Sequence, residues 1–313
     1  MENSFDTVPL RHRGLIEVRG RQAGAASTFL QGLVTCNMNG VGPGRPTFGA
    51  LLTPQGKILV DFIISAVDAQ TFLMDCARDQ LPALLKRLTL FRLRAPIDLT
   101  DVTDRYEMTL REDHVRTNSP TKEAVVVPDP RLPILGVRTY RPFGDGETSP
   151  ATPPDDDALA RYRTLLIDNG VGEIGTVFTP DKHFLLDLNY DRLNGVDYTK
   201  GCFVGQEVTS RMKRKGSIRK RTLSVIIDRD ADLTGADIVL DGQSIGSVLA
   251  AQRSGETIRA LGLIRIDRLG TDLHAQSAVP VCVRHDEGET PATLQVPAYL
   301  LDGKAGDNEV RKV

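Results

Sequence analysis

The stretch KGCFVGQEVTSR, from Lys200 to Arg211, decides how this chain is interpreted. Cys202 lies in a glycine-flanked segment, which is typical of a tight turn, and the residues from Gln206 onwards are good helix formers with no breaker. The stretch predicts a helix that begins near Gly205. Its free N–H groups, together with the cation of Lys200, would favour a thiolate at Cys202. Cys202 is thus a candidate reactive thiol; the alternative is a small apolar side chain buried in a turn.

The same stretch leads into a basic run. Its cations are Arg211, Lys213, Arg214, Lys215, Arg219, Lys220 and Arg221. Cations in the last helical turn stabilise the macrodipole, and Gly216 is the expected stop. The run could also neutralise phosphates, so a nucleic-acid-binding module is one hypothesis. No aromatic residue is interleaved for base stacking, and this argues against nucleic acid as the partner.

Asp61 interrupts the apolar run from Ile58 to Ile64. A strand that is apolar on both faces is typical of the interior, and a buried carboxylate needs hydrogen-bond partners or a ligand. The alternative is an edge position at which Asp61 faces water. Asp61 is therefore a second candidate ligand contact.

Helical spacing predicts three further helices, and apolar runs around them predict strands. The run TPQG, from Thr53 to Gly56, predicts a turn between two strands. The order of elements is that of an α+β protein and not of a regular βαβ array. The helix stripes are Ala26, Phe29, Leu30 and Leu33; Leu81, Leu84, Leu85 and Leu88; and Leu159, Tyr162, Leu165 and Leu166.

The chain divides at an acidic, proline-rich segment, GDGETSPATPPDDD, which predicts a linker that enters a helix capped by Asp155 or Asp157. Beyond Thr222 the pattern changes to short alternating strands, with a hairpin turn at Asp241 and Gly242, so the end of the chain predicts a β-barrel. The predicted parts are 1–143, an α+β part; 144–157, the linker; 158–221, a second part of the same body; 222–300, the barrel; and 301–313, a frayed tail.

Composition excludes several protein classes. The 313 residues are 40% hydrophobic and 26% charged, with a net charge of −2, so the chain is neither disordered nor fibrous. No apolar run could cross a membrane, and we expect a cytosolic protein without a membrane partner. The cysteines stand singly, with no CxxC pair, so we expect no metal ligand set within one chain. They are Cys36, Cys76, Cys202 and Cys282.

These motifs carry a family resemblance. KGCFVGQE resembles the KGCYxGQE signature of the YgfZ family, folate-binding relatives of the glycine-cleavage T-protein whose mitochondrial members assist the maturation of [4Fe-4S] proteins. FLQGLVT, LLTPQGKILVDFII and NGVDY follow the order of that family. Two segments depart from it. The family's Thr-Asn-Asp is Thr35, Cys36 and Asn37 here, and an Arg and Glu before Gly170 correspond to Leu166 and Asp168.

The resemblance implies an α+β, T-protein-like folate-binding fold with a C-terminal β-barrel. It also implies that tetrahydrofolate, or a one-carbon derivative of it, is bound in a central cavity shared with the Cys202 turn, and that iron-sulfur clients or assembly proteins are partners. Cys202 and Lys200 would supply the reactive chemistry. The implied folate contacts are Asp61, Lys200, Gln206, Glu207 and Arg211.

Two other interpretations remain open beside this accessory factor. Gln206 and Glu207, in the first helical turn, could simply cap backbone N–H groups. A folate-dependent aminomethyltransferase is the alternative function, since the fold and Asp61 would suit it, whereas the KGC signature belongs to the accessory branch.

Overall fold

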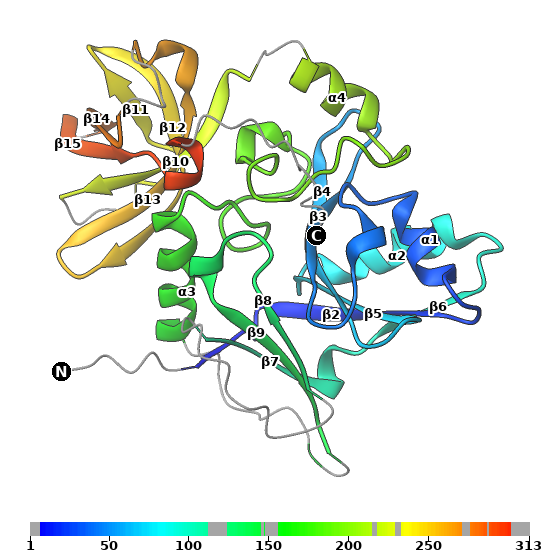
Figure 1. Cartoon of the computed structure of the whole chain (residues 1–313). Coiled ribbons are helices and arrows are strands. Elements are labelled where there is room, and N and C mark those ends of the chain that lie inside the picture. Colours follow the sequence, from blue (N-terminus) through cyan, green and yellow to red (C-terminus); the bar gives the residue numbers. More distant parts are fainter. Residues whose placement is uncertain are drawn as a thin grey trace, which may run out of the picture.

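The structure, a computed structural model, describes residues 7–111, 124–144, 147, 156–214, 218–228, 233–270, 276–286 and 288–301. Two sheets and a barrel lie side by side, with the barrel at the upper left of Figure 1. The helices are α1 (Ala25–Gln31), α2 (Leu81–Arg92), α3 (Asp156–Asp168), α4 (Gln206–Arg214) and α5 (Ala298–Leu301).

The first sheet is antiparallel, and its two faces have different partners. Side chains of α1 and α2 pack with Phe62 and Ile64 on one face, whereas Ile63 joins the core formed with the middle of the chain. Asp61 shares the parity of Ile63 and therefore points away from α1 and α2. The strands, in spatial order, are β3 (Thr47–Leu52), β4 (Ile58–Ala66), β5 (Thr71–Ala77), β2 (Arg13–Gly20) and β6 (Ile97–Asp101).

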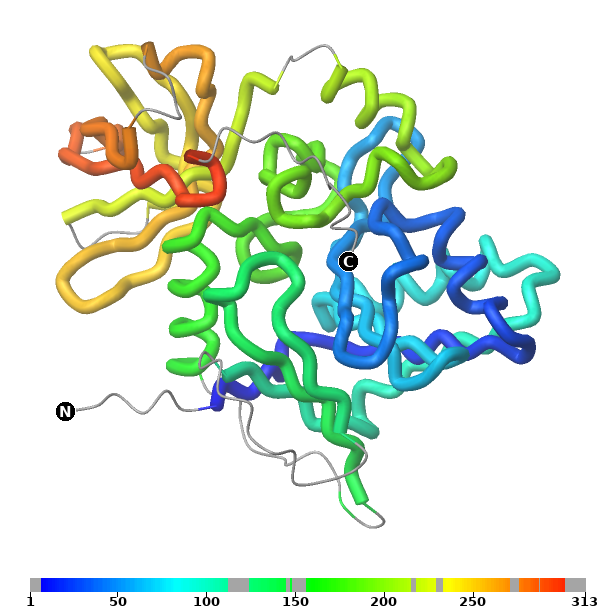
Figure 2. The backbone as a smooth tube through the Cα atoms, viewed as in Figure 1, coloured from blue at the N-terminus to red at the C-terminus, as the bar shows by residue number. Residues whose placement is uncertain are grey.

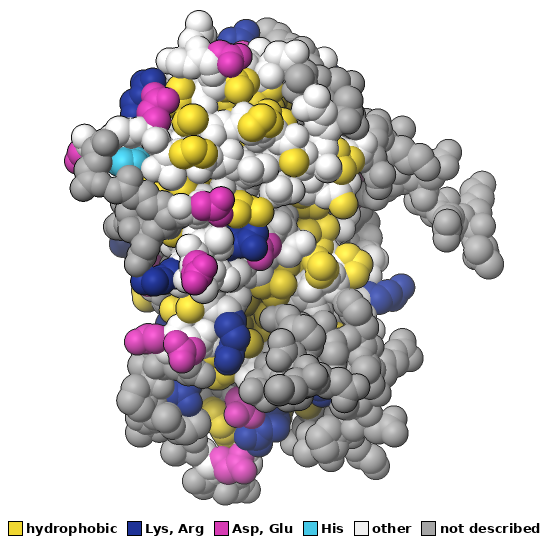
Figure 3. All heavy atoms as spheres, turned by 90° about the vertical axis from the view of Figure 1, so that its left-hand side faces the viewer, with side chains coloured by type: hydrophobic (Ala, Val, Ile, Leu, Met, Phe, Trp, Pro, Cys, Tyr) yellow, Lys and Arg dark blue, Asp and Glu magenta, His cyan; other side chains and the backbone are white. Residues whose placement is uncertain are grey.

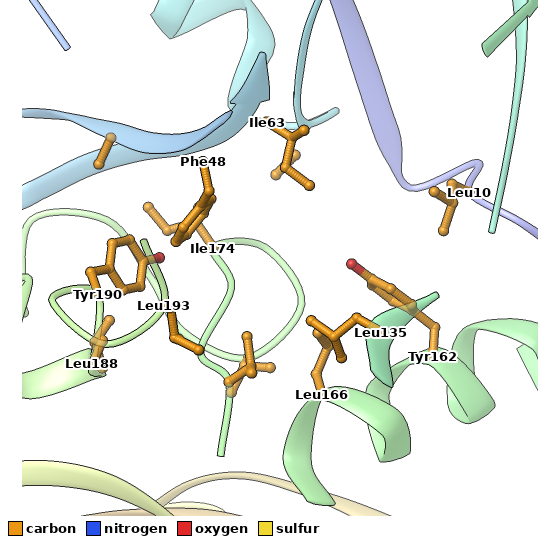
Figure 4. Packing of buried hydrophobic residues seen from close by; sticks show 14 of the residues in the cluster. Leu10, Phe48, Ile63, Leu135, Tyr162, Leu166, Ile174, Leu188, Tyr190 and Leu193 are labelled. Atoms are coloured by element: carbon orange, nitrogen blue, oxygen red, sulfur yellow. The ribbon is translucent and has the colours of Figure 1, made fainter. Parts of the chain in front are cut away.

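A second antiparallel sheet and α3 complete the central core. Figure 4 shows Tyr190 beside Phe48 and Ile174; the ring centroids of Phe48 and Tyr190 are 4.7 Å apart. This core joins residues from both sheets to the segment that follows α3. The strands, in spatial order, are β1 (Val8–Pro9), β7 (Tyr106–Arg111), β9 (Val137–Pro142) and β8 (Val125–Pro128).

The C-terminal strands close into a six-stranded barrel with its own apolar interior. Asp241 and Gly242 have φ values of 50° and 77°, which is the left-handed geometry that a two-residue hairpin requires. Figure 2 shows the barrel at the upper left, next to the helix α3. The strands, in order around the barrel, are β10 (Lys220–Ile227), β13 (Thr257–Arg265), β12 (Gln243–Ser254), β11 (Asp237–Leu240), β14 (Ala278–His285) and β15 (Gly288–Gln295).

The α+β class and the terminal barrel are confirmed, and α1, α2 and α3 lie where the apolar spacing predicts them. The predicted cap at Asp157 is wrong, because α3 already begins at Asp156. Asp156 and Asp157 both lie in the first turn of the helix, where the macrodipole favours negative charge. Asp155, Lys215, Gly216 and the tail after Leu301 lie outside the described residues. The predicted linker and domain boundaries stay predictions.

The surface carries charges of both signs. On the barrel side of the molecule, Figure 3 shows acidic and basic side chains interspersed with apolar ones. None of the described helices is long and apolar enough to span a membrane.

Candidate functional site

Asp61 is buried in the centre of the molecule, with 1% of its surface exposed. Tyr190 donates its hydroxyl hydrogen to Oδ2 at 2.6 Å, and the N–H of Ile174 donates to the same oxygen at 3.1 Å. The other oxygen, Oδ1, has no hydrogen-bond partner among the described residues. The water-facing edge position is therefore wrong, and a buried carboxylate oxygen remains for a donor.

A network of buried charges surrounds this carboxyl. Arg13 Nε lies 2.6 Å from Asp75 Oδ1, Arg138 Nη1 lies 2.7 Å from Asp75 Oδ2, and Arg131 Nη1 lies 2.7 Å from Glu173 Oε2. Three arginines are balanced by three acids, so Asp61 is a fourth carboxyl without an ion pair among the described residues. The members are Arg13, Asp75, Asp129, Arg131, Arg138 and Glu173, each at most 4% exposed.

The charges set the protonation of the two central acids in opposite directions. Burial and the negative charge of Glu173 raise the pKa of Asp61 to about 6, against the opposing effect of Arg13. Burial also acts to raise the pKa of Glu173, but Arg13, Arg131 and Arg138 outweigh it and hold that pKa well below its usual range. Asp61 is thus the carboxyl at this site that exchanges a proton in the mildly acidic range.

The sequence did not reveal this network. A charged residue next to apolar residues in a strand is normally expected to face solvent, and this expectation applies to Arg13 and Arg138. Only the packing of β2, β5 and β9 with the loop at Glu173 buries them together.

The Cys202 turn is held by the residues before it. Asp197 Oδ1 accepts hydrogen bonds from the backbone N–H groups of Thr199 at 2.7 Å and Lys200 at 3.2 Å. Asn37 Nδ2 donates to Asp197 Oδ2 at 2.8 Å. Cys202 itself is exposed. The turn therefore presents a thiol to solvent on a fixed backbone.

Lys200 anchors the turn to the loop that follows α1. Its ammonium donates to the carbonyl oxygens of Val34 at 2.5 Å and Cys36 at 2.8 Å, and only 7% of the residue is exposed. Burial lowers the pKa of Lys200, against the opposing effects of Cys36 and Asp197. Among the described residues no hydrogen bond joins Lys200 to Cys202, so stabilisation of the thiolate by Lys200 stays a prediction.

Thr35 connects the segment before the turn to β3, the strand beside Asp61. Its hydroxyl donates to the carbonyl of Gly195 at 2.6 Å and accepts from the N–H of Ala50 at 2.8 Å. Ala50 is the register partner of Asp61 across β3 and β4. The two sequence-predicted halves of the site are therefore joined through one buried side chain.

The remaining predicted contacts lie on α4. Its position confirms the predicted helix start, because α4 begins at Gln206. Arg211 Nη2 donates to Glu207 Oε1 at 2.5 Å, and both side chains are exposed. No hydrogen bond or ion pair joins either of them to Asp61 among the described residues. The folate contacts assigned to Gln206, Glu207 and Arg211 stay predictions.

The positions that depart from the family pattern have structural roles here. Cys36 is buried, and burial raises the pKa of its thiol to about 11. A Cβ added to Gly49 would lie 2.5 Å from Cys36 Sγ. Leu166 is fully buried in the central core. Asp168 Oδ1 lies 3.7 Å from Nη1 of Arg259 in the barrel. The described residues contain no group of three or more His, Cys, Asp or Glu side chains arranged for a metal ion.

Comparisons with known structures confirm the fold. The chain superimposes on the glycine cleavage system aminomethyltransferase T from Bartonella henselae with a TM-score of 0.70 and 14% identity, covering 94% of this chain and 86% of that one. Residues 219–300 match the family model described as the C-terminal beta-barrel domain of CAF17.

Sequence comparison identifies nearer relatives. The mitochondrial iron-sulfur cluster assembly factor IBA57 homolog of Neurospora crassa is 30% identical, over 97% of this chain and 78% of the relative. The Mycosarcoma maydis homolog is 31% identical over 67% of this chain, which spans about half (54%) of that protein. The mitochondrial iron-sulfur cluster assembly factor IBA57 of Mus musculus is 26% identical over 85% of this chain and 79% of the mouse protein.

These relatives correct one expectation and refine another. The expected cytosolic location is wrong, because all three are named as mitochondrial proteins. The resemblance to an iron-sulfur accessory branch of T-protein-like proteins is confirmed at that level. With 30% identity over most of both chains, this protein belongs to the IBA57 family of iron-sulfur cluster assembly factors.

Proposed function

We propose that this protein is a tetrahydrofolate-binding accessory factor for the assembly or repair of [4Fe-4S] proteins, of the YgfZ type. Family membership supports the iron-sulfur role. The observation that carries folate binding is Oδ1 of Asp61, a buried acceptor with no hydrogen-bond partner among the described residues, in a carboxyl whose pKa is raised to about 6. A pterin offers ring and amino N–H groups that such an oxygen accepts.

Oδ1 of Asp61 is the atom that makes this site suitable for tetrahydrofolate. Tetrahydrofolate supplies a reduced pterin whose ring nitrogens carry one-carbon units. Asp61 would accept a hydrogen bond from the pterin or hold a proton at Oδ1, and Tyr190 would keep Oδ2 oriented. Because Asp61 is buried, the side chains that cover it must move to admit the ligand.

Cys202 would have a separate task. It is exposed, whereas Cys36 and Cys76 are buried and Cys282 is half-buried. A single exposed thiol cannot hold a [4Fe-4S] cluster, so a partner protein or second copy would supply the other ligands. Aminomethyl transfer is not proposed, since the likeness to the T-protein shows the fold alone.

Calorimetric titration of tetrahydrofolate under anaerobic conditions tests the folate site. Asp61→Asn should weaken binding about tenfold or more, the loss expected for a charge-assisted hydrogen bond, whereas Cys202→Ala should bind like the wild type. Asp79→Asn, an exposed carboxyl, is the matched control. Equal affinity of Asp61→Asn and wild type would refute this site.

The iron-sulfur role is tested in cells that lack the protein. The wild type should restore the activity of a [4Fe-4S] enzyme, and Cys202→Ala should not, although it binds folate. Full restoration by Cys202→Ala would show that the thiol is dispensable.

A further inference from the structure

The outer wall of the barrel carries a cavity of about 210 Å³ that the folate proposal does not use. Four strands, β10 to β13, contribute to it, together with the short turn after β13. Three cations, two hydroxyls and one carboxylate line this cavity. They are Lys220, Arg265, Arg268, Ser244, Ser247 and Asp237.

Two of the cations lie opposite each other on neighbouring strands, and their repulsion lowers the stability of the barrel. Lys220 on β10 is the direct register partner of Arg265 on β13. Like charges directly opposite on neighbouring strands destabilise a sheet. Arg265 is partly compensated, since its Nη2 lies 2.7 Å from Asp267 Oδ2. Within the described ranges, no hydrogen bond or ion pair is recorded for the Lys220 ammonium.

The other polar groups leave the cavity with a surplus of donors. Arg268 Nη1 donates to the carbonyl of Ser244 at 2.8 Å, which leaves the rest of its guanidinium fork for a ligand. Asp237 accepts from Ser244 Oγ at 3.2 Å. One cavity carboxylate therefore stands against three cations.

Positive charge extends beyond the rim of the cavity. Burial, together with the positive charges of Lys57, Lys220 and Lys182, lowers the pKa of His183 to about 4. These three lysines come from the β3–β4 turn, the segment before Phe184 and β10. They lie near His183 together with Asp187, whose carboxyl Lys220 and Lys57 also affect, so one carboxyl offsets part of this positive charge.

We propose that this cavity binds a small ligand that carries two or more oxyanion groups, in the form of phosphates or of chain carboxylates. Arginine forks and serine hydroxyls donate to such oxygens, and the lysine adds charge. No aromatic side chain is present among the described residues that line the cavity, so a stacked nucleic-acid base does not fit it. The inference is independent of folate binding at Asp61.

Titration calorimetry at physiological salt, with inorganic tripolyphosphate and a γ-linked triglutamate as probes, tests this site. At least one probe should bind the full-length protein with one-to-one stoichiometry. Lys220→Gln and Arg265→Gln should each weaken binding about tenfold, the loss of one charge-assisted hydrogen bond. The tighter probe tells a phosphate ligand from a carboxylate one.

Lys86→Gln is the matched control, because it removes one exposed cation from α2, outside the cavity. It should leave the affinity within about twofold. Arg265→Lys keeps the positive charge and therefore shows whether a loss of binding in Arg265→Gln comes from the charge or from misfolding. Asp61→Asn should bind the probe like the wild type. Absence of binding by both probes, or equal losses in Lys220→Gln and Lys86→Gln, would overturn the proposal.

Discussion

At the scale of single residues, Asp61 stands out because its surroundings favour the protonated form. Its carboxyl is buried, and the cations nearby are already paired with other acids. The folded state therefore binds this proton more tightly than the unfolded chain, since the pKa rises from 3.8 to about 6. With respect to this group the fold is most stable below pH 4, and it loses stability as the pH rises through 6.

Asp61→Asn should remove that loss, because the amide does not ionise and can still accept from Tyr190 and Ile174. Relative to wild type, the free energy of unfolding of the variant should rise by about 2.5 kcal/mol between pH 4 and pH 7.5. Urea unfolding across this range measures the difference. Asp79→Asn, which replaces an exposed carboxyl, is the matched control, and a curve for Asp61→Asn that runs parallel to the wild-type curve would contradict the prediction.

At the scale of elements, the approach to α4 depends on Gly205. Its φ is +80°, and an added Cβ would lie 2.8 Å from the carbonyl oxygen of Thr53. Both the backbone conformation and the close approach exclude a side chain. The start of α4 near this glycine could be predicted from sequence, but its contact with the β3–β4 turn could not, because that contact joins residues about 150 positions apart.

Gly205→Ala should destabilise the fold by about 2 kcal/mol and change the rate at which Cys202 is alkylated, since the turn before α4 must shift. Gly201→Ala provides the comparison: its φ is ordinary and a Cβ there meets open space. Its effect should stay within about 0.5 kcal/mol. Equal effects of the two substitutions on unfolding and alkylation would disprove the role of Gly205.

At the scale of the whole molecule, buried charges connect parts that the sequence describes separately. The apolar spacing of residues such as Leu84 and Leu88 was enough to place α2, and the Asp241–Gly242 pair was enough to place a hairpin. Arg138 shows the limit of such reasoning. Nothing local distinguishes an arginine that faces water from one that pairs with Asp75 across two sheets.

Arg138→Met should destabilise the protein by about 3–5 kcal/mol, because it leaves Asp75 and Asp129 buried without their shared cation. Thermal and urea unfolding would measure the change. Arg21→Met breaks an exposed pair with Asp98 and should have little effect. A comparably small effect of Arg138→Met would mean that the network adds nothing to stability.

The hydroxyl of Thr35 gives the molecule a mechanical property. It is bonded at once to the segment that leads to Cys202 and to the strand beside Asp61, so neither can be displaced without straining the other. A ligand that displaced the strand beside Asp61 would strain the hydrogen bond between Ala50 and Thr35, and a shift of the segment before Cys202 would strain the bond between Thr35 and Gly195. Thr35 is thus the buried side chain at which the two parts of the candidate site meet.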